Sequence, residues 1–316
     1  MYFPYLRGRQ FELIAIRELI ENSLISKNVM PVVEPVKLSS ALIKTLTSFQ
    51  KRDRALGLVR NPRVGSMRKD LANEKYKKDK ERFYELLKTS DILTFLYADA
   101  NLSENLSSIE RQGIKKQDIA TICMDQDSIP HFESAYASDS PRFNFIREPS
   151  VFHRRMPRQR VLFEDRFPKK SRNVEYLDPE DEPFSSDHLY YAQDGYLGFS
   201  DFSVVGDEYF ETGFAPYAIA IHIVYFATDQ TLRVRHFVSD TNDDITDPAG
   251  KFAEALKKLV IWNQTQRLDT YGIRTFESMY KNRSYPGLGT VKKLSIMHHL
   301  ELMSRYLDGV SKNEIL

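Results

Sequence analysis

The stretch YFPYLRGRQFELIAIREL, residues 2–19, begins with an apolar run and passes directly into a helical pattern. Its first residues suit a β-strand, and Gly8 permits the sharp turn that a strand-to-helix connection needs. From Gln10 onward, apolar residues recur at helical spacing, which predicts an amphipathic helix to about residue 24. The stretch therefore predicts a strand, a tight turn and a helix as one unit.

The same unit recurs along the chain. Short apolar runs, most of them followed by a helical pattern, predict strands at residues 29–36, 55–62, 91–101, 119–127, 142–149, 160–165 and 195–206. Continuous apolar strands that alternate with helices are typical of a parallel sheet covered by helices. Eight such units favour closure into a (β/α)8 barrel of the TIM type. An open doubly wound sheet with a small antiparallel subdomain is the alternative.

The predicted connections are mostly helical. Helices are expected at residues 38–49, 69–88, 104–112, 130–137 and 186–193, with serines as N-cap residues for the first and Gly113 as a C-cap. The connector between the sixth and seventh strands is too short and too basic for a full helix. The barrel could therefore be irregular at its sixth unit.

The last third of the chain departs from this rhythm. Two β-rich runs, residues 217–226 and 231–240, are separated by four residues and predict an antiparallel hairpin. Residues 247–268 are expected to form the last barrel helix, and residues 290–307 a C-terminal helix. The expected organisation is one (β/α)8-like domain over residues 1–316, with a hairpin insertion at 207–246 and a C-terminal extension at 270–316.

Composition and charge are those of a globular protein. Of the 316 residues, 41% are hydrophobic and 28% are charged, and the formal net charge of +1 argues against a generic binder of polyanions. Cys123 is the only cysteine, which excludes an internal disulfide and a cysteine-based zinc cluster. No apolar stretch approaches about eighteen residues and no signal-peptide pattern is present, so we expect a cytoplasmic protein without membrane contact.

Polar residues directly follow each predicted strand. In a barrel, the C-terminal ends of the strands form the mouth that carries chemistry, so these side chains should meet in one ring. The ring would contain Arg7, Glu34, Arg60, Asp99, Asp125, Arg147, Glu148, Glu164, Asp165 and Asp201. Strand ends also carry polar residues simply because they meet water, and Arg–Glu pairs there can be structural salt bridges.

The ring combines two kinds of chemistry. Arginines offer two parallel donors to a phosphate or carboxylate, and Arg7, Arg60 and Arg147 are the candidate phosphate ligands. Converging carboxylates can act as acid or base, or bind a divalent cation through oxygen. The candidate catalytic residues are Glu34, Asp125, Glu164 and Asp201, and the candidate metal ligands are Glu34 and Asp201. The cofactor that such carboxylates imply is Mg²⁺ or Mn²⁺.

Two basic segments and one histidine pair stand apart from this ring. Residues 51–70 and 153–172 are rich in lysine and arginine, and such runs are usually solvated surface but can contact nucleic-acid phosphates. His222 and His236 lie on facing strands of the hairpin, where we expect hydrogen-bonded sheet residues rather than metal ligands. The candidate nucleic-acid contacts are Arg154, Arg155, Arg158, Lys169 and Lys170.

The N-terminal block YFPYLRGRQFELIAIREL, followed by PVVEPVK and GLVRNP, resembles the beta family of bacterial and phage proteins. It is most similar to a group whose members begin with a Tyr-x-Pro-Tyr-x-Arg-Gly-x-Gln-x-Glu-Leu block, and the match is clear over about the first 65 residues. The most typical positions are Arg7, Gln10, Glu12, Glu34 and Arg60. Genes of this group often lie beside restriction-endonuclease-like partners, which implies a two-component anti-phage or mobile-element defence system without an assigned activity.

Two functional hypotheses follow. In the first, the mouth binds a phosphorylated or nucleic-acid-like ligand and the chain works with a nuclease-like partner. In the second, the same mouth belongs to a stand-alone, metal-dependent phosphodiester or phosphate-ester hydrolase. No P-loop, dinucleotide-binding glycine motif or GxSxG motif occurs in the sequence, so whether the protein is an enzyme stays open.

Overall fold

The computed structural model of the protein describes residues 1–148, 150–210 and 216–309. Where a predicted strand, insertion or C-terminal extension includes other positions, those positions lie outside the described residues. Two compact units make up the chain. The barrel unit comprises Met1–Leu13, Met30–Asp165 and Asp187–Asp201, and the second unit comprises Ile14–Val29, Arg166–Ser186 and Phe202–Leu316.

The barrel unit is built on eight parallel strands that pair in the order β1-β2-β3-β4-β5-β6-β7-β9. Their bounds are β1 Tyr5–Leu6, β2 Val32–Val33, β3 Leu56–Val59, β4 Ile92–Tyr97, β5 Ala120–Cys123, β6 Asn144–Ile146, β7 Arg160–Phe163 and β9 Gly198–Ser200. A parallel bridge from Tyr2 to Phe199 and a 2.8 Å hydrogen bond from the Tyr5 N–H to the Asp201 carbonyl join the last strand to the first. The expected (β/α)8-like fold is thereby confirmed as a nearly closed barrel.

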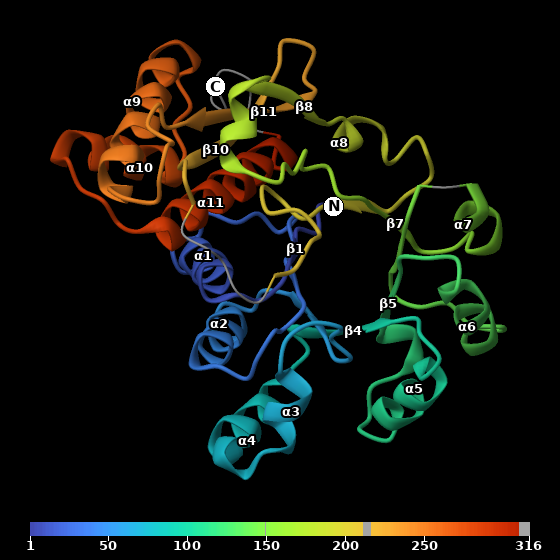
Figure 1. Cartoon of the computed structure of the whole chain (residues 1–316). Coiled ribbons are helices and arrows are strands. Elements are labelled where there is room, and N and C mark those ends of the chain that lie inside the picture. The colour runs from blue at the N-terminus through green and yellow to red at the C-terminus, as the bar shows by residue number, and fades with distance from the viewer. Residues whose placement is uncertain (149, 211–215, 310–316) are drawn as a thin grey trace. The chain divides into compact units, whose positions relative to one another are not determined.

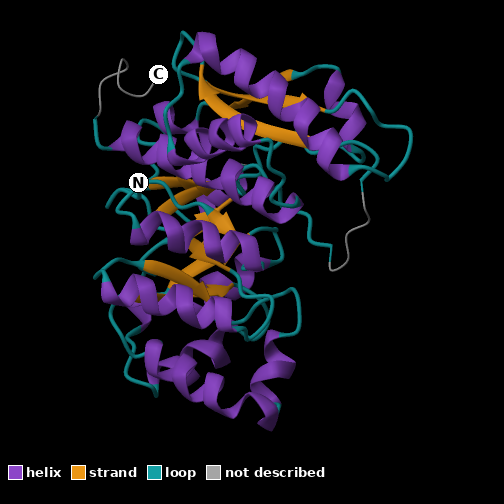
Figure 2. Ribbon diagram, turned by 90° about the vertical axis from the view of Figure 1, so that its left-hand side faces the viewer, coloured by secondary structure: helices purple, strands orange, loops and turns teal. Residues whose placement is uncertain are grey.

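Helices alternate with these strands and lie outside them (Figures 1 and 2). Their bounds are α1 Gln10–Glu21, α2 Ser40–Lys51, α3 Met67–Ala72, α4 Lys77–Leu86, α5 Leu102–Glu110, α6 Ser128–Ala135, α7 Ser150–Arg155 and α8 Asp187–Tyr190, with short 3₁₀ turns η1 Glu74–Tyr76 and η2 Lys116–Asp118. A further 3₁₀ turn, η3 Asn173–Leu177, belongs to the second unit. The sixth unit is irregular, since α7 has only 6 residues between β6 and β7.

One predicted helix is interrupted. Residues 69–88 were expected to be continuous, but α3 ends at Ala72 and the chain passes through η1 before α4. The side chain of Asn73 accepts a hydrogen bond from the Lys75 N–H at 2.9 Å, which satisfies the start of a new turn. Asparagine often competes with helix hydrogen bonding in this way, so the break follows from local chemistry.

Aromatic rings fill the inside of the barrel. The Phe145 ring centroid lies 5.3 Å from Phe3, 5.1 Å from Phe95 and 5.8 Å from Phe163, all in edge-to-face contact. Gly57 leaves the space that the Phe95 ring occupies, because a Cβ there would lie 2.5 Å from Phe95 Cε2. The barrel interior at this level is a packed core rather than a channel.

The start of α2 provides a test of the predicted capping. Ser39 Oγ accepts a 3.2 Å hydrogen bond from the Leu42 N–H. Ser39→Ala should lower the free energy of unfolding by about 1 kcal/mol, because this N–H loses its acceptor. Urea denaturation followed by circular dichroism measures the loss. Ser40→Ala, an exposed serine one position later, is the matched control, and equal losses in both variants would contradict the capping role.

Among its described residues, the second unit contains a three-stranded sheet, three helices that follow it in the chain, the later part of α1 and the turn η3. The predicted hairpin is confirmed as β10 Ala220–Phe226 and β11 Leu232–Val238, which pair antiparallel. A third strand, β8 Asp181–Ser185, pairs with β11 and was not expected. The helices are α9 Pro248–Gln266, α10 Tyr271–Asn282 and α11 Leu288–Leu307. Although residues 247–268 were expected to be a barrel helix, α9 packs against β10 and β11.

Helices cover one edge of this sheet. β10 and β8 are its outer strands. The Nε2 atom of His298, on α11, lies 2.6 Å from the Val224 carbonyl oxygen, and its Nδ1 lies 2.8 Å from Thr270 Oγ1. β8 carries Pro183, which has no N–H to donate.

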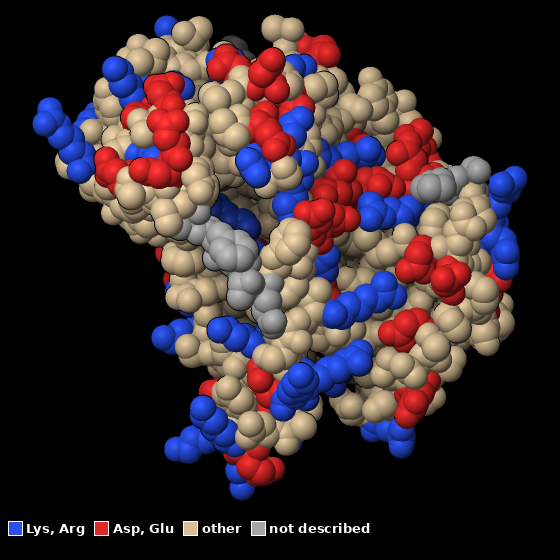
Figure 3. Space-filling model, viewed as in Figure 1, with Lys and Arg blue, Asp and Glu red and all other residues tan. Residues whose placement is uncertain are grey.

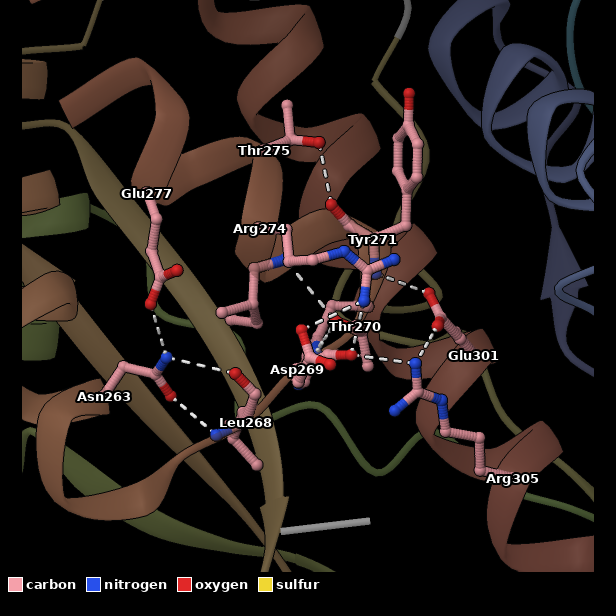
Figure 4. A network of polar contacts seen from close by, with 12 residues as sticks. Asn263, Leu268, Asp269, Thr270, Tyr271, Arg274, Thr275, Glu277, Glu301 and Arg305 are labelled. Atoms are coloured by element: carbon pink, nitrogen blue, oxygen red, sulfur yellow. Dashed lines mark hydrogen bonds and ion pairs between the residues drawn. The ribbon is translucent and has the colours of Figure 1, made fainter. Parts of the chain in front are cut away.

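A polar network ties the three helices together (Figure 4). The Asn263 side chain donates to the Leu268 carbonyl at 3.1 Å and to Glu277 at 2.9 Å, which closes the turn between α9 and α10. Glu301 on α11 accepts a 2.7 Å hydrogen bond from the Tyr271 N–H at the start of α10. These contacts satisfy helix ends and are structural. No helix within the described parts of the chain is both long and apolar enough to span a membrane.

Candidate functional site

The site is centred on Glu34, which follows β2 and is 0% exposed. Its Oε2 atom accepts hydrogen bonds from the guanidinium of Arg7 and, at 3.0 Å each, from the hydroxyls of Tyr5 and Tyr97. Its Oε1 atom accepts the Arg63 N–H at 2.7 Å. We call Tyr5, Arg7, Glu34, Arg63 and Tyr97 the mouth cluster, since they come from the C-terminal ends of β1, β2 and β4 and from the segment after β3.

The two tyrosines are coupled to each other as well as to the carboxylate. Their hydroxyl oxygens lie 2.7 Å apart. Burial raises the pKa of Tyr5 well above its usual value, and the adjacent Tyr97 and Glu34 raise it further. Burial and Glu34 also raise the pKa of Tyr97. Both phenols therefore stay protonated at neutral pH and serve as donors to the buried carboxylate.

The Glu34 carboxylate and the two phenols keep Arg7 positively charged. Burial alone would lower its pKa, but the Glu34 carboxylate and the two phenols raise the pKa of Arg7 overall. Its side chain is 13% exposed, while that of Glu34 is fully buried. A buried pair of this kind holds its geometry closely, because either charge without the other would be costly.

Arg63 is the most accessible cation of the cluster. Its guanidinium carbon lies 4.2 Å from the centroid of the Tyr97 ring, and its backbone N–H is fixed by Glu34. Its Nη1 lies 3.6 Å from Asp125 Oδ2, and 38% of the side chain is exposed. The sequence did not single out this residue. Its signal in the sequence was its place in the basic segment of residues 51–70, directly after the NP turn that ends the third predicted strand.

Asn61 positions the ends of β3 and β4 next to this cluster. Its Oδ1 accepts the Tyr97 N–H at 2.9 Å, and its Nδ2 donates to the Tyr97 carbonyl at 3.1 Å. Nδ2 also donates to Asp99 Oδ2 at 3.2 Å. Asn61 is itself buried, so these three contacts hold the Tyr97 main chain and Asp99 in place.

A second ion pair follows β6 and β7. Arg147 Nη1 lies 2.8 Å from Glu164 Oε2, and the Glu148 N–H donates to Glu164 Oε1 at 2.7 Å. The side chains of Arg147 and Glu164 are 21% and 17% exposed. The predicted ring is therefore populated here by a partly exposed arginine and its carboxylate.

Arg60 lies apart from the mouth cluster. Side chains alternate along a strand, and Gly57, three positions earlier, faces the Phe95 ring inside the barrel. Arg60 therefore points outward, where its Nη2 donates to Gln112 at 3.0 Å. Burial lowers the pKa of Arg60, although the Tyr84 phenol opposes this effect.

Asp201 follows β9 and is 3% exposed. Its Oδ1 accepts a 2.7 Å hydrogen bond from the Tyr2 hydroxyl, and the Tyr2 ring stacks on Phe199 at a centroid distance of 5.0 Å. Burial and the Asp201 charge raise the pKa of Tyr2. Of the members of the expected ring, Arg7 and Glu34 are in contact, and Asp201 is bonded to Tyr2.

The candidate metal ligands Glu34 and Asp201 are both engaged by protein donors. Both oxygens of Glu34 are already occupied by four donors, and Asp201 is bonded to Tyr2. Within residues 1–148, 150–210 and 216–309, His, Cys, Asp and Glu side chains form no group of three or more that could hold a metal ion. Glu34 thus serves as one half of a buried ion pair with Arg7 in this arrangement.

The candidate nucleic-acid contacts are mostly paired with acids. Arg155 in the barrel unit bonds to Glu133 through two nitrogens. In the second unit, Lys169 lies 3.0 Å from Glu208, and Lys170 lies 3.0 Å from Glu182. Arg154 and Arg158 are exposed. On the face seen in Figure 3, basic side chains lie beside acidic ones rather than forming a field of one sign.

Comparison of this chain with protein families, curated proteins and solved structures found no match.

Proposed function

We propose that the mouth of the barrel binds an anionic ligand of the phosphate-ester or nucleic-acid class, with Arg63 as its first contact. The observation that carries this proposal is the setting of Arg63. Its backbone is fixed by a buried carboxylate and its guanidinium is stacked on Tyr97, while 38% of the side chain is exposed. An arginine held in this way loses little freedom when it binds an oxyanion.

The partner that Arg63 has now is easily displaced. Its 3.6 Å contact with Asp125 is long, and the Asp125 side chain is 50% exposed. An exposed pair of this kind contributes about 0–1 kcal/mol, whereas a phosphate accepts two parallel N–H donors from an arginine. A phosphorylated ligand can therefore replace Asp125 at Arg63.

The other two arginines of the mouth are committed to carboxylates. Arg7 is paired with buried Glu34, and Arg147 with Glu164. In this proposal, their positive charges attract an anionic ligand at a distance, but their N–H groups are already bonded to carboxylates. Because the mouth carboxylates are engaged by arginines or by hydrogen bonds, we extend the proposal to ligand binding and not to hydrolysis.

Substitution of Arg63 tests the proposal. Arg63→Gln should weaken binding of ATP, inorganic tripolyphosphate or a short single-stranded oligonucleotide by about tenfold or more, because one charge-assisted pair is lost. Isothermal titration calorimetry at low salt measures the affinity. Arg68→Gln, an exposed arginine on α3, removes the same charge five positions away and should leave affinity nearly unchanged. Absence of binding to the intact protein, or equal weakening in both variants, would rule the proposal out.

The biological setting is a separate proposal that rests on the resemblance of the first 65 residues. We propose that the chain acts beside a nuclease-like protein in a two-component defence system. Co-expression with the protein encoded next to it, followed by co-purification, tests this part. If the two chains do not associate, the proposal of a nuclease-like partner is wrong, whereas the proposal of an anion site at Arg63 is not affected.

A further inference from the structure

A histidine pair lies on one face of the three-stranded sheet in the second unit. His222 on β10 and His236 on β11 are direct cross-strand partners, and their Nδ1 atoms lie 2.8 Å apart. The His236 side chain is 0% exposed, whereas His222 keeps part of its surface in contact with solvent. The pair is therefore largely enclosed, and His222 is the less enclosed residue of the two.

The surrounding contacts fix the tautomer of each ring. His236 Nε2 lies 3.2 Å from Glu182 Oε2, and a carboxylate can only accept, so this nitrogen carries the hydrogen. His236 Nδ1 is then the acceptor and His222 Nδ1 must be the donor. Lys170 donates to Glu182 Oε1 at 3.0 Å. The result is one chain of donors from His222 through His236 to Glu182.

Two aromatic rings from the segment before β8 cover the pair. The Tyr176 ring centroid lies 4.6 Å from His222 and 4.5 Å from His236, and Phe167 lies 5.1 Å from His222. The Tyr176 hydroxyl accepts the Lys170 N–H at 2.9 Å. The segment Arg166–Ser186 is joined to the hairpin by the pairing of β8 with β11 and by the ion pair of Asp181 with Arg233. The histidines, Glu182 and these two rings add a second set of contacts between the same parts.

We propose that His222 and His236 form a proton-operated latch that holds the segment Arg166–Ser186 against the hairpin at neutral pH and releases it in acid. The geometry gives the reason. A first proton can be accommodated, because one Nδ1 remains an acceptor. A second proton places N–H groups on both Nδ1 atoms, which then repel each other at a distance where they now bond.

Burial favours the neutral, closed state of the pair. Burial lowers the pKa of His222 well below its usual value, and His236 and Lys292 add to this effect. Burial also lowers the pKa of His236, and Lys170 acts in the same direction, whereas Glu182 and Asp181 oppose it. The titratable and charged groups facing the pair are thus Lys170, Tyr176, Asp181 and Glu182 from the segment and β8, and Lys292 from α11.

Hydrogen exchange tests the latch in the intact chain. Amide protection of residues 166–186, corrected for the intrinsic exchange rate, should fall by about tenfold or more between about pH 7.5 and about pH 4.5, since each proton taken up changes the opening equilibrium tenfold per pH unit. The ring centroid of Trp262, the only tryptophan, lies 5.1 Å from that of Tyr225 on β10 and 5.3 Å from that of Phe237 on β11. Its fluorescence therefore reports whether the hairpin itself stays folded. The latch requires release while the Trp262 emission is unchanged.

Two further measurements separate the latch from general acid unfolding. His222→Phe keeps a ring against Tyr176 but cannot take up a proton, so protection in acid should persist, while His131→Gln on α6 should behave as wild type. In the unaltered protein, ¹⁵N chemical shifts should show the hydrogen on Nδ1 of His222 and on Nε2 of His236. Constant protection of residues 166–186, loss only together with the Trp262 signal, or the opposite tautomers would overturn the proposal.

Discussion

Glu34→Ala should lower the free energy of unfolding by about 3–5 kcal/mol, because it leaves the largely buried Arg7 guanidinium without its counter-charge. The hydroxyls of Tyr5 and Tyr97 lose their common acceptor at the same time, and the Arg63 N–H loses the group that fixes it. Denaturant titration followed by circular dichroism measures the change. The variant should also lose the anion affinity that depends on the placement of Arg63.

Two comparisons show whether the loss comes from the buried pair. Asp125→Ala removes a half-exposed carboxylate that contacts Arg63 at 3.6 Å and accepts the Ser128 N–H at 2.9 Å at the start of α6, and should cost about 1 kcal/mol. The double variant Arg7→Ala with Glu34→Ala should be much less destabilised than the sum of the two single variants, because neither charge is left alone. Additive losses, or equal losses for Glu34→Ala and Asp125→Ala, would contradict the central role of the pair.

His298→Gln should remove a large part of the acid sensitivity of the second unit. Burial lowers the pKa of His298 from its usual value to about 4. Its Nε2 donates to the Val224 carbonyl, which can only accept, so Nδ1 accepts from Thr270 and the ring is neutral. The folded form takes up the proton less readily than the unfolded chain, so stability is complete above about pH 6.5 and falls as the pH drops towards 4.

The expected size of this effect is about 3 kcal/mol between about pH 6.5 and pH 4, from the difference between the two pKa values. At neutral pH the variant should be less stable than the wild type, and this difference should shrink by that amount as the solution becomes acidic. Unfolding monitored by Trp262 emission at several pH values measures both curves. His131→Gln serves as the control, and parallel curves for wild type and His298→Gln would show that His298 does not carry the effect.

The sequence pattern predicted the barrel because its strands are buried on both faces and therefore read as apolar runs. Residues 91–101, for example, contain β4. The connector before β7 was expected to be too short for a full helix, and it holds only the six-residue α7. The strand β8 could not be read in this way. Its sequence DEPFS holds two acids and a proline, and its strand geometry comes from pairing with β11 rather than from its own propensity.

The site was predictable only in part for a related reason. The Arg7–Glu34 contact followed from the convergence of strand ends, but Tyr5 and Tyr97 looked like ordinary core residues inside apolar runs. Arg60 was misplaced because successive side chains point to opposite faces, and the sequence alone does not settle which residue after a strand faces inward. Arg63 joins the site through a backbone N–H, a contact that no side-chain pattern can signal.

The two outer strands of the second unit's sheet bear on self-association. An outer strand with free main-chain groups can recruit a strand from another molecule, and proteins prevent this with prolines, charges or a covering helix. β8 contains Pro183 and two acids, which disfavour pairing with another strand. β10 is covered by α11, and His298 on this helix donates to the Val224 carbonyl of β10. The sequence AIHIVYF of β10 combines high strand propensity with low charge. If acid detaches α11, we expect aggregation of the protein to begin at β10.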